Sequence, residues 1–328
     1  PAAGEAADMT LAFGSCARYQ EDAEQPIWRA VAAARPDMFL WLGDNVYVDA
    51  FEPSVFDAEY QRQRAVPSFA PVMASVPQLA IWDDHDFGLN DHDRTNPVKK
   101  VGLDAFRRYW ANPAYGTTDV PGVFFRQPLG EVDLFALDGR WHRDPNEAPD
   151  SPEKTMLGAG QLAWLKAGLK DSRATFKILA CGSGWSAAKG MGGDSWASFQ
   201  NERDALFDFI RDEKIGGVLL ISGDTHVAEL NAIPWSDRGG YDFYDLVSSP
   251  LAQPTSLSWI RRSPELRLRI PYTGDVNFGL LDFSFADVPT ARFRVRNSMG
   301  LDAWQPFEVT SQDLKNGVAS AARLTRLR

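Results

Sequence analysis

Short apolar segments alternate with amphipathic helical segments over the first two thirds of the chain. Six apolar runs of strand length are interpreted as buried strands: residues 10–16, 38–43, 79–83, 134–138, 176–180 and 217–222. Between them, apolar residues recur at i, i+3 and i+4 spacing, which is typical of helices, in residues 26–34, 104–110, 161–170 and 198–212. This alternation predicts an α/β sandwich, because each helix buries its apolar stripe against a sheet.

The pattern changes beyond His226. Strand-like segments at 241–247, 279–285 and 290–295 are separated by turns rich in Pro, Gly and Ser, and they favour a second, more antiparallel sheet. The sequence contains no internal repeat and no long linker. We therefore expect a single domain over residues 1–328, whose last part, about 313–328, is a solvated helical tail.

The charge balance limits the classes of partner. The chain has 34 basic and 44 acidic residues, a net charge of −10, which argues against duplex nucleic acid or an anionic membrane surface as the main partner. No apolar run approaches the roughly 20 residues that a bilayer requires, so we expect no stable membrane insertion. An anionic substrate stays open, because cations held at a site can make it locally positive.

Two features bear on the cellular compartment. Two cysteines permit at most one disulfide, so the chain is no disulfide-stapled scaffold. The chain begins Pro-Ala-Ala-Gly without an initiating Met, which indicates a processed N-terminus and makes a periplasmic or secreted location an expectation. The sequence indicates no oligomeric state.

Four of the expected strands are followed at once by a cluster of polar residues. The clusters are Gly-Ser-Cys at 14–16, Gly-Asp-Asn-Val-Tyr at 43–47, Asp-Asp-His-Asp at 83–86 and Ser-Gly-Asp-Thr-His at 222–226. Because ligands of open α/β sheets bind at the carboxyl ends of strands, we expect these clusters to converge. Together they supply a thiolate, a phenolate, carboxylates and two imidazoles, a donor set that indicates a metal centre.

The donors divide by hardness. Cys16, Tyr47 and His226 suit a transition metal, whereas Asp84 and Asp224 offer only hard oxygen. Asp44 is placed to bridge two ions.

In this order the four clusters resemble the alkaline phosphatase D (PhoD-like) family of calcineurin-like metallophosphoesterases. The resemblance extends to Leu-Asp-Gly-Arg at 137–140 and to Asn-Phe-Gly at 277–279, and so covers nearly the whole chain. It implies an αββα sandwich of two mixed sheets flanked by helices. It also implies a dinuclear centre of iron (Fe³⁺) and a second divalent ion, Ca²⁺ before Mg²⁺, Mn²⁺ or Zn²⁺.

Carried over position by position, the resemblance divides six ligands between the two ions. Iron would be held by Cys16, Asp44, Tyr47 and His226, and the second ion by Asp44, Asp84 and Asp224. Position 84 departs from the wider superfamily, which has Asn there, and residues 180–185 lack the additional His of that superfamily. The second site is thus rich in oxygen, which fits calcium or magnesium better than zinc.

The resemblance gives two further residues a part in the chemistry. His85 would stabilise the transition state or protonate the leaving group, and Arg140 would clamp a phosphate oxygen. Each also has a simpler interpretation. His85 could instead be a core histidine that bonds to a neighbouring acid. Arg140 could instead form a surface ion pair with Asp138.

The predicted function is metal-dependent hydrolysis of small phosphate esters, monoesters or diesters, by a hydroxide that the two cations generate. The alternatives are a phospholipase D-like activity on lipid head groups and a metal-binding surface module without catalysis. The glycine-rich segment 182–193 matches no nucleotide-binding fingerprint and is interpreted as a mobile loop on the substrate side. Trp185 and Trp196 are core residues that could also wall a substrate pocket.

Overall fold

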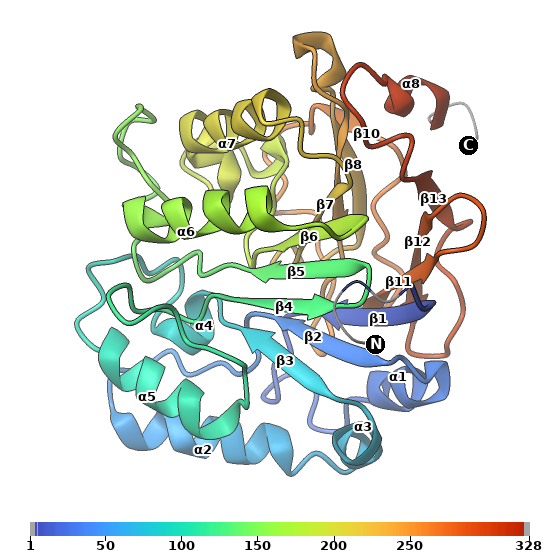
Figure 1. The fold of residues 1–328 in the computed structure, drawn as a ribbon. Coiled ribbons are helices and arrows are strands. Elements are labelled where there is room, and N and C mark those ends of the chain that lie inside the picture. Colours follow the sequence, from blue (N-terminus) through green and yellow to red (C-terminus); the bar gives the residue numbers. More distant parts are fainter. Residues whose placement is uncertain (1–3, 5, 325–328) are drawn as a thin grey trace.

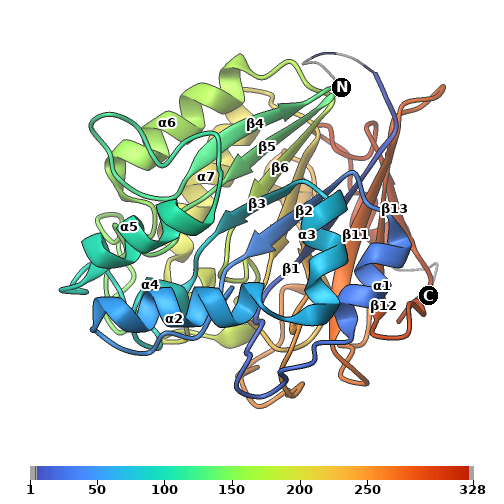
Figure 2. The ribbon, with the colours of Figure 1, turned by 90° about the horizontal axis from the view of Figure 1, so that it is seen from below.

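Two mixed β-sheets pack face to face between layers of helices (Figures 1 and 2). This computed structural model describes residue 4 and residues 6–324. The first sheet has the order β13 (Phe307–Thr310), β12 (Thr290–Asn297), β11 (Asn277–Ser284), β1 (Met9–Gly14), β2 (Met38–Leu42) and β3 (Gln78–Ile81). The second has the order β10 (Leu266–Arg267), β8 (Glu229–Ile233), β9 (Phe243–Val247), β7 (Val218–Ser222), β6 (Phe176–Ala180), β5 (Val132–Ala136) and β4 (Phe125–Leu129).

Helices cover the outer face of each sheet. Beside the first sheet lie α1 (Ile27–Ala34), α2 (Pro53–Arg64), α3 (Ala70–Ser75) and α5 (Lys99–Tyr109), and beside the second lie α6 (Gly158–Asp171) and α7 (Gln200–Asp212) (Figure 1). The short elements are α4 (Asp84–Phe87), α8 (Ser320–Leu324) and the 3₁₀ turns Pro67–Phe69, Ala187–Lys189, Trp196–Ser198 and Ser236–Arg238. The αββα sandwich expected from the sequence is therefore confirmed.

The strands that lead to the polar clusters run parallel within each sheet. β1 pairs in parallel with β2, and β2 with β3. In the second sheet β5, β6, β7 and β9 form a parallel series. Because parallel strands end at the same edge, the carboxyl ends of β1, β2 and β3 share one edge and those of β5, β6 and β7 another.

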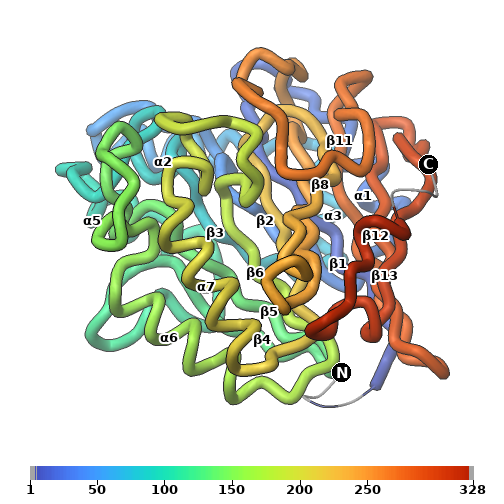
Figure 3. Tube along the Cα trace, turned by 90° about the horizontal axis from the view of Figure 1, so that it is seen from above, coloured from blue at the N-terminus to red at the C-terminus, as the bar shows by residue number. Residues whose placement is uncertain are grey.

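The strands after His226 form no sheet of their own, and that expectation was wrong. β8, β9 and β10 extend the second sheet, whereas β11 pairs antiparallel with β1, with Leu11 opposite Leu281. Figure 3 shows the C-terminal strands lying beside β1. The reason is that β2 occupies one edge of β1 and leaves the other edge with unpaired backbone groups, which β11 satisfies.

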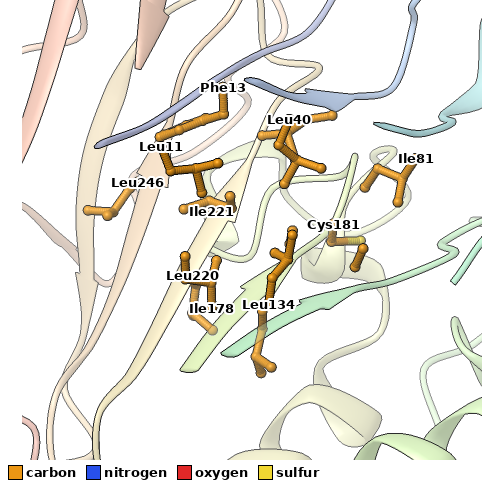
Figure 4. Close-up of a cluster of buried hydrophobic side chains, with 14 of the residues drawn as sticks. Leu11, Phe13, Leu40, Ile81, Leu134, Ile178, Cys181, Leu220, Ile221 and Leu246 are labelled. Atoms are coloured by element: carbon orange, nitrogen blue, oxygen red, sulfur yellow. The ribbon is translucent and has the colours of Figure 1, made fainter. Parts of the chain in front are cut away.

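Side chains from both sheets fill the space between them. Leu11 and Leu40 of the first sheet face Ile178 and Leu220 of the second, and all four are fully buried (Figure 4). Every residue of β7 is buried, because a sheet covered on both faces needs apolar residues on each. Cys181 lies in the same apolar cluster and is fully buried, so it is a packing residue.

The chain's last segment is less helical than expected. Residues 311–317 form turns, helix α8 spans only Ser320–Leu324, and residues 325–328 lie outside the described part. The turn is held by Asp313, whose carboxylate accepts hydrogen bonds from the Thr310 N–H and hydroxyl at 2.9 and 2.8 Å. No helix within the described residues combines the length and apolarity needed to cross a bilayer.

The interface between the sheets should carry much of the stability. We expect Leu220→Ala to lower the free energy of unfolding by about 2–5 kcal/mol, because it leaves a cavity between close-packed layers. Urea unfolding measures this. The matched control is Leu301→Ala, at a residue that is 58% exposed, which should change it by less than about 0.5 kcal/mol. Equal effects of the two changes would contradict this account of the core.

Candidate metal centre

The polar clusters that follow β1, β2, β3 and β7 meet at one place. The Cys16 Sγ lies 3.5 Å from Asp44 Oδ2, and the Tyr47 hydroxyl donates to the same oxygen at 3.3 Å. The two sheets are joined here, because the Asp224 N–H donates to the Ser15 hydroxyl at 3.0 Å. The convergence of the four clusters is therefore a feature of the fold.

Donor atoms from these clusters gather closely enough to surround metal ions. Among the described residues three groups form, each with its donor atoms within 4.8 Å of one another: Cys16, Asp44 and His226; Asp44, Asp84 and His85; and Asp83, Asp84, Asp194 and Asp224. Asp44 belongs to the first two groups and Asp84 to the last two, so these two carboxylates link all three groups.

Four of the six expected ligands have a left-handed backbone. The φ angles are 62° at Cys16, 50° at Asp44, 64° at Asp224 and 53° at His226. Residues other than glycine seldom adopt this conformation, and each instance costs about 1–3 kcal/mol. Such strain persists only where the surroundings fix it, and clusters of it are typical of functional sites.

Close approach of the backbones explains two glycines of the motifs. A Cβ at Gly43, where φ is +91°, would lie 2.4 Å from Asp83 Cβ, and a Cβ at Gly223 would lie 2.3 Å from the Ser15 hydroxyl. Both positions therefore require glycine, and both bring a ligand-bearing turn against a neighbouring strand end.

The buried carboxylates outnumber the positively charged groups close to them. Burial raises the pKa of Asp44 well above its usual range, and the charges of Asp84 and Cys16 add to the rise. Asp84 Oδ1 and Asp83 Oδ2 are buried and accept no hydrogen bond from any described residue. Unsatisfied buried oxygens of this kind are costly, and bound cations would satisfy them. The residues present therefore fit metal ions.

Burial sets the protonation states of the nitrogen and sulfur donors. Burial lowers the pKa of His226 to about 3, with Lys189 contributing, so the imidazole is neutral, which is the form that binds a metal. Burial raises the pKa of the Cys16 thiol to about 11, so a metal ion would have to displace the thiol proton.

His85 is held by an acid outside the motifs that predicted it. Its Nδ1 lies 2.6 Å from Asp49 Oδ1, and its ring packs 4.1 Å from that of Tyr47. Burial lowers the pKa of His85, but Asp84, Asp44 and Asp49 outweigh burial and raise it to about 10. The imidazole is therefore fixed in orientation, with Nε2 left to face the site, and it is protonated at neutral pH.

Arg140 lies behind the ligands, fully buried. Its guanidinium bonds to Asp83 and Asp194, and one of its nitrogens lies 3.6 Å from Asp84 Oδ1. The surface ion pair with Asp138 is absent from the described contacts, since that carboxylate instead accepts the backbone N–H of Arg140 at 2.8 Å. The phosphate clamp stays a prediction, and it would require a carboxylate to release the guanidinium.

A pocket of about 200 Å³ opens above the donor groups. Its lining residues are Asp84, His85, Asn90, Asp91, Lys189, Gly193, Asp194, Asp224, His226, Ser258, Trp259 and Arg261. Lys189 pairs with the Asp224 carboxylate. It was not predicted as a site residue from the sequence, and its place in the glycine-rich segment is the one feature that could have indicated it. Trp185 and Trp196 are fully buried and stack on each other 4.6 Å apart, so neither walls the pocket.

Gln253 is a further residue that the sequence did not reveal. Its side-chain amide contacts both the Tyr47 hydroxyl and the His226 Nε2, and so joins two of the expected iron ligands. It lies just after a segment whose backbone pairs with the turn that follows β1, where the Ala252 N–H donates to the Cys16 carbonyl at 3.0 Å.

The fold of this chain is similar to the folds of two phosphatases of known structure. It superposes on the solved structure of PhoD with a TM-score of 0.79 at 17% identity, covering 97% of this chain and 73% of that one. A purple acid phosphatase, PPD1 of yellow lupin, matches with a TM-score of 0.66 at 12% identity, over 94% of this chain and 55% of that one.

The family is shown by the sequence comparisons. The family model for PhoD-like phosphatases matches residues 11–261, so the chain belongs to the PhoD-like phosphatase family. Alkaline phosphatase D of Bacillus subtilis is 25% identical over 287 residues, and the match covers 72% of this chain. The chain spans about half of that relative, 48% of its length.

Asp245 anchors the loop that forms one side of the pocket, and it supplies a test of the local structure. Its carboxylate accepts the N–H groups of Trp185 and Ser186 at 3.0 and 2.9 Å and the Ser222 hydroxyl at 2.8 Å. Burial raises the pKa of Asp245 to about 7, so the folded state keeps a proton that the unfolded chain releases near pH 4. This contribution to stability is complete below pH 4 and is lost as the pH rises to about 7.

Between pH 5 and pH 8 the free energy of unfolding should fall in wild type because Asp245 loses its proton. We expect this fall to be about 1–3 kcal/mol smaller in Asp245→Asn, which has no proton to lose there. Urea unfolding at the two pH values measures the difference. Asp119→Asn, at an exposed loop residue, is the control and should keep the wild-type slope. Identical slopes in wild type and Asp245→Asn would contradict the assignment.

Proposed function

We propose that this protein hydrolyses small phosphate esters with metal ions held at the ends of β1, β2, β3 and β7. The single observation that carries the proposal is the sharing of Asp44 between two groups of donor atoms. Asp44 links the group of Cys16 and His226 to Asp84, and Asp84 also belongs to the group made of carboxylates alone. This linkage favours two unlike ions held side by side. Pairs of ions about 3.5–4 Å apart catalyse phosphate-ester hydrolysis by stabilising the attacking and the leaving oxygen.

The donor types support a division between the ions. Cys16, Tyr47 and His226, with Asp44, would hold iron, because thiolate, phenolate and imidazole suit a transition metal. The second ion would lie among carboxylates, with Asp84 and Asp224 as ligands, and this all-oxygen set favours Ca²⁺. Asp83 and Asp194 belong to the same acidic group, but Arg140 already bonds to both.

When bound, the ions supply an activated water and offset the negative charge at phosphorus. The chain's own residues would do the rest. Asp49 fixes His85 through Nδ1, so the Nε2 proton is available to the leaving oxygen of the substrate. Lys189 lines the same pocket, and its ammonium would bind a phosphate oxygen while it stays close to Asp224.

The His85–Asp49 pair favours an enzyme over a metal-binding surface module. A site that only stores metal has no use for a protonated imidazole held beside the ligands. The pocket has a volume of about 200 Å³ and its lining is mostly charged or polar, which suits a small phosphate ester better than a lipid head group with its chains. The arrangement does not select between monoesters and diesters.

The iron assignment predicts a visible absorption band. Iron bound by a phenolate and a thiolate absorbs by charge transfer, so we expect the band to shift or vanish in Tyr47→Phe and in Cys16→Ser. Metal analysis and a visible spectrum of each protein measure this. Tyr60→Phe, at another buried tyrosine, is the control and should keep the wild-type band. A colourless, iron-free and fully active wild type would falsify the iron assignment.

The role of His85 predicts a loss of turnover without a loss of metal. We expect His85→Ala to lower kcat for an alkyl phosphate by about 10²–10⁴-fold, the usual contribution of a general acid, and Asp49→Asn to cause a smaller loss. Metal content should stay at the wild-type level in both. His142→Ala, whose ring bonds to the Pro121 carbonyl, is the control. Wild-type turnover in His85→Ala would refute the assignment.

A further inference from the structure

One wall of the pocket is built from segments that the metal-ligand motifs do not include. These segments are 186–194, which carries Lys189, and 256–262. Backbone bonds fasten them together, because the N–H groups of Arg261 and Arg262 both donate to the Ala188 carbonyl at 3.0 Å. The wall is therefore a fixed part of the pocket.

Trp259 presents an open aromatic surface on this wall. The residue is 45% exposed, although a tryptophan gains more than most residues from burial. The rings of Trp259 and His226 make an edge-to-face contact, with their centroids 5.3 Å apart and their planes at 90°. Trp259 is thus held beside an expected metal ligand, with much of its surface free to stack against another planar group.

Arg261 adds an available positive charge to the same wall. It lines the pocket two residues after Trp259. Within the described part of the chain no carboxylate lies within 4.0 Å of its guanidinium, whereas Lys189 pairs with Asp224. Its donors are therefore free to bind an anionic or carbonyl group of a ligand.

We propose that Trp259 and Arg261 form a subsite for the organic part of the substrate, and that this part is a planar aromatic ring, as in a nucleotide. The inference rests on the proposed function, because it places the phosphate over Asp84 and Asp224. The ring would stack on Trp259 while Arg261 binds a polar group at its edge. The other lining residues of this wall are Lys189, Gly193, Asp194 and Ser258. None of them has a large apolar side chain, so beyond the Trp259 ring the wall offers no apolar surface to an alkyl chain.

Two substrates that differ only in the ring test the subsite. AMP and ribose 5-phosphate carry the same phosphate ester, and AMP adds the base. We expect wild type with iron and calcium bound to have a kcat/KM for AMP about 10-fold higher, mainly through a lower KM. Trp259→Ala should remove this preference, and Trp259→Phe should retain most of it.

Leu257→Ala is the matched control for these variants. Leu257 lies on the same segment and is 49% exposed, but it does not line the pocket. It should leave the preference for AMP at the wild-type value. Arg261→Gln should raise the KM for AMP with little change in kcat. Equal kcat/KM values for the two substrates in wild type would overturn the inference and leave the proposed function standing.

Binding of inert analogues separates the subsite from catalysis. Phenylphosphonate and methylphosphonate have a carbon–phosphorus bond that ester hydrolysis does not cleave. In titration calorimetry we expect metal-loaded wild type to bind phenylphosphonate about 10-fold more tightly, and Trp259→Ala to bind both equally. Should wild type cleave no phosphate ester yet show this difference, the proposed function fails and the subsite stands. Equal binding in wild type overturns the subsite.

Discussion

The crowding of buried carboxylates around Asp44 and Asp84 is the constraint on which the site depends. Several acids are brought within 4.8 Å of one another in groups, and buried oxygens of Asp83 and Asp84 accept no described hydrogen bond. Like charges so close and so far from water are strongly unfavourable unless cations neutralise them. Arg140 and Lys189 supply part of that positive charge. The remainder is what metal ions would contribute, so metal binding and local stability are linked.

The arrangement of strands in the two sheets brings these carboxylates together. Parallel β1, β2 and β3 deliver three clusters to one edge, and β7 delivers the fourth from the other sheet. The apolar interface between the sheets holds the two edges in register, and strained turns at Cys16, Asp44 and Asp224 direct the side chains inward. The stability of the core thus offsets the energetic cost of turns that an unconstrained chain would not adopt.

The sequence predicted the parts of the fold and site that depend on local patterns. Strand β6 was placed at its observed bounds, because a fully apolar run shows itself directly. Helix α2 was missed, since its buried face carries Glu59 and Gln63 beside Phe56 and Tyr60, which blurs the helical pattern. The distribution of β8 to β13 over both sheets depends on which strand edges remain unpaired, and a sequence pattern does not encode that.

The same division holds at the site. The six expected ligands lie in motifs that follow strands, and the structure brings their donors into shared groups. Lys189, Asp49, Gln253 and Trp259 come from loops whose positions only the folded chain defines. The burial of Arg140 was equally hidden, because Asp194, to which it bonds, lies 54 residues further along the chain.

Anomalous diffraction from crystals grown with iron and calcium would show whether this site binds two unlike ions. Data collected on both sides of the iron absorption edge would locate iron independently of calcium. We expect an iron peak within bonding distance of Cys16 Sγ and a ring nitrogen of His226, and a second, lighter ion among Asp44, Asp84 and Asp224. Well-ordered crystals with no metal density at these residues, their carboxylates paired only with Arg140 and Lys189, would contradict it.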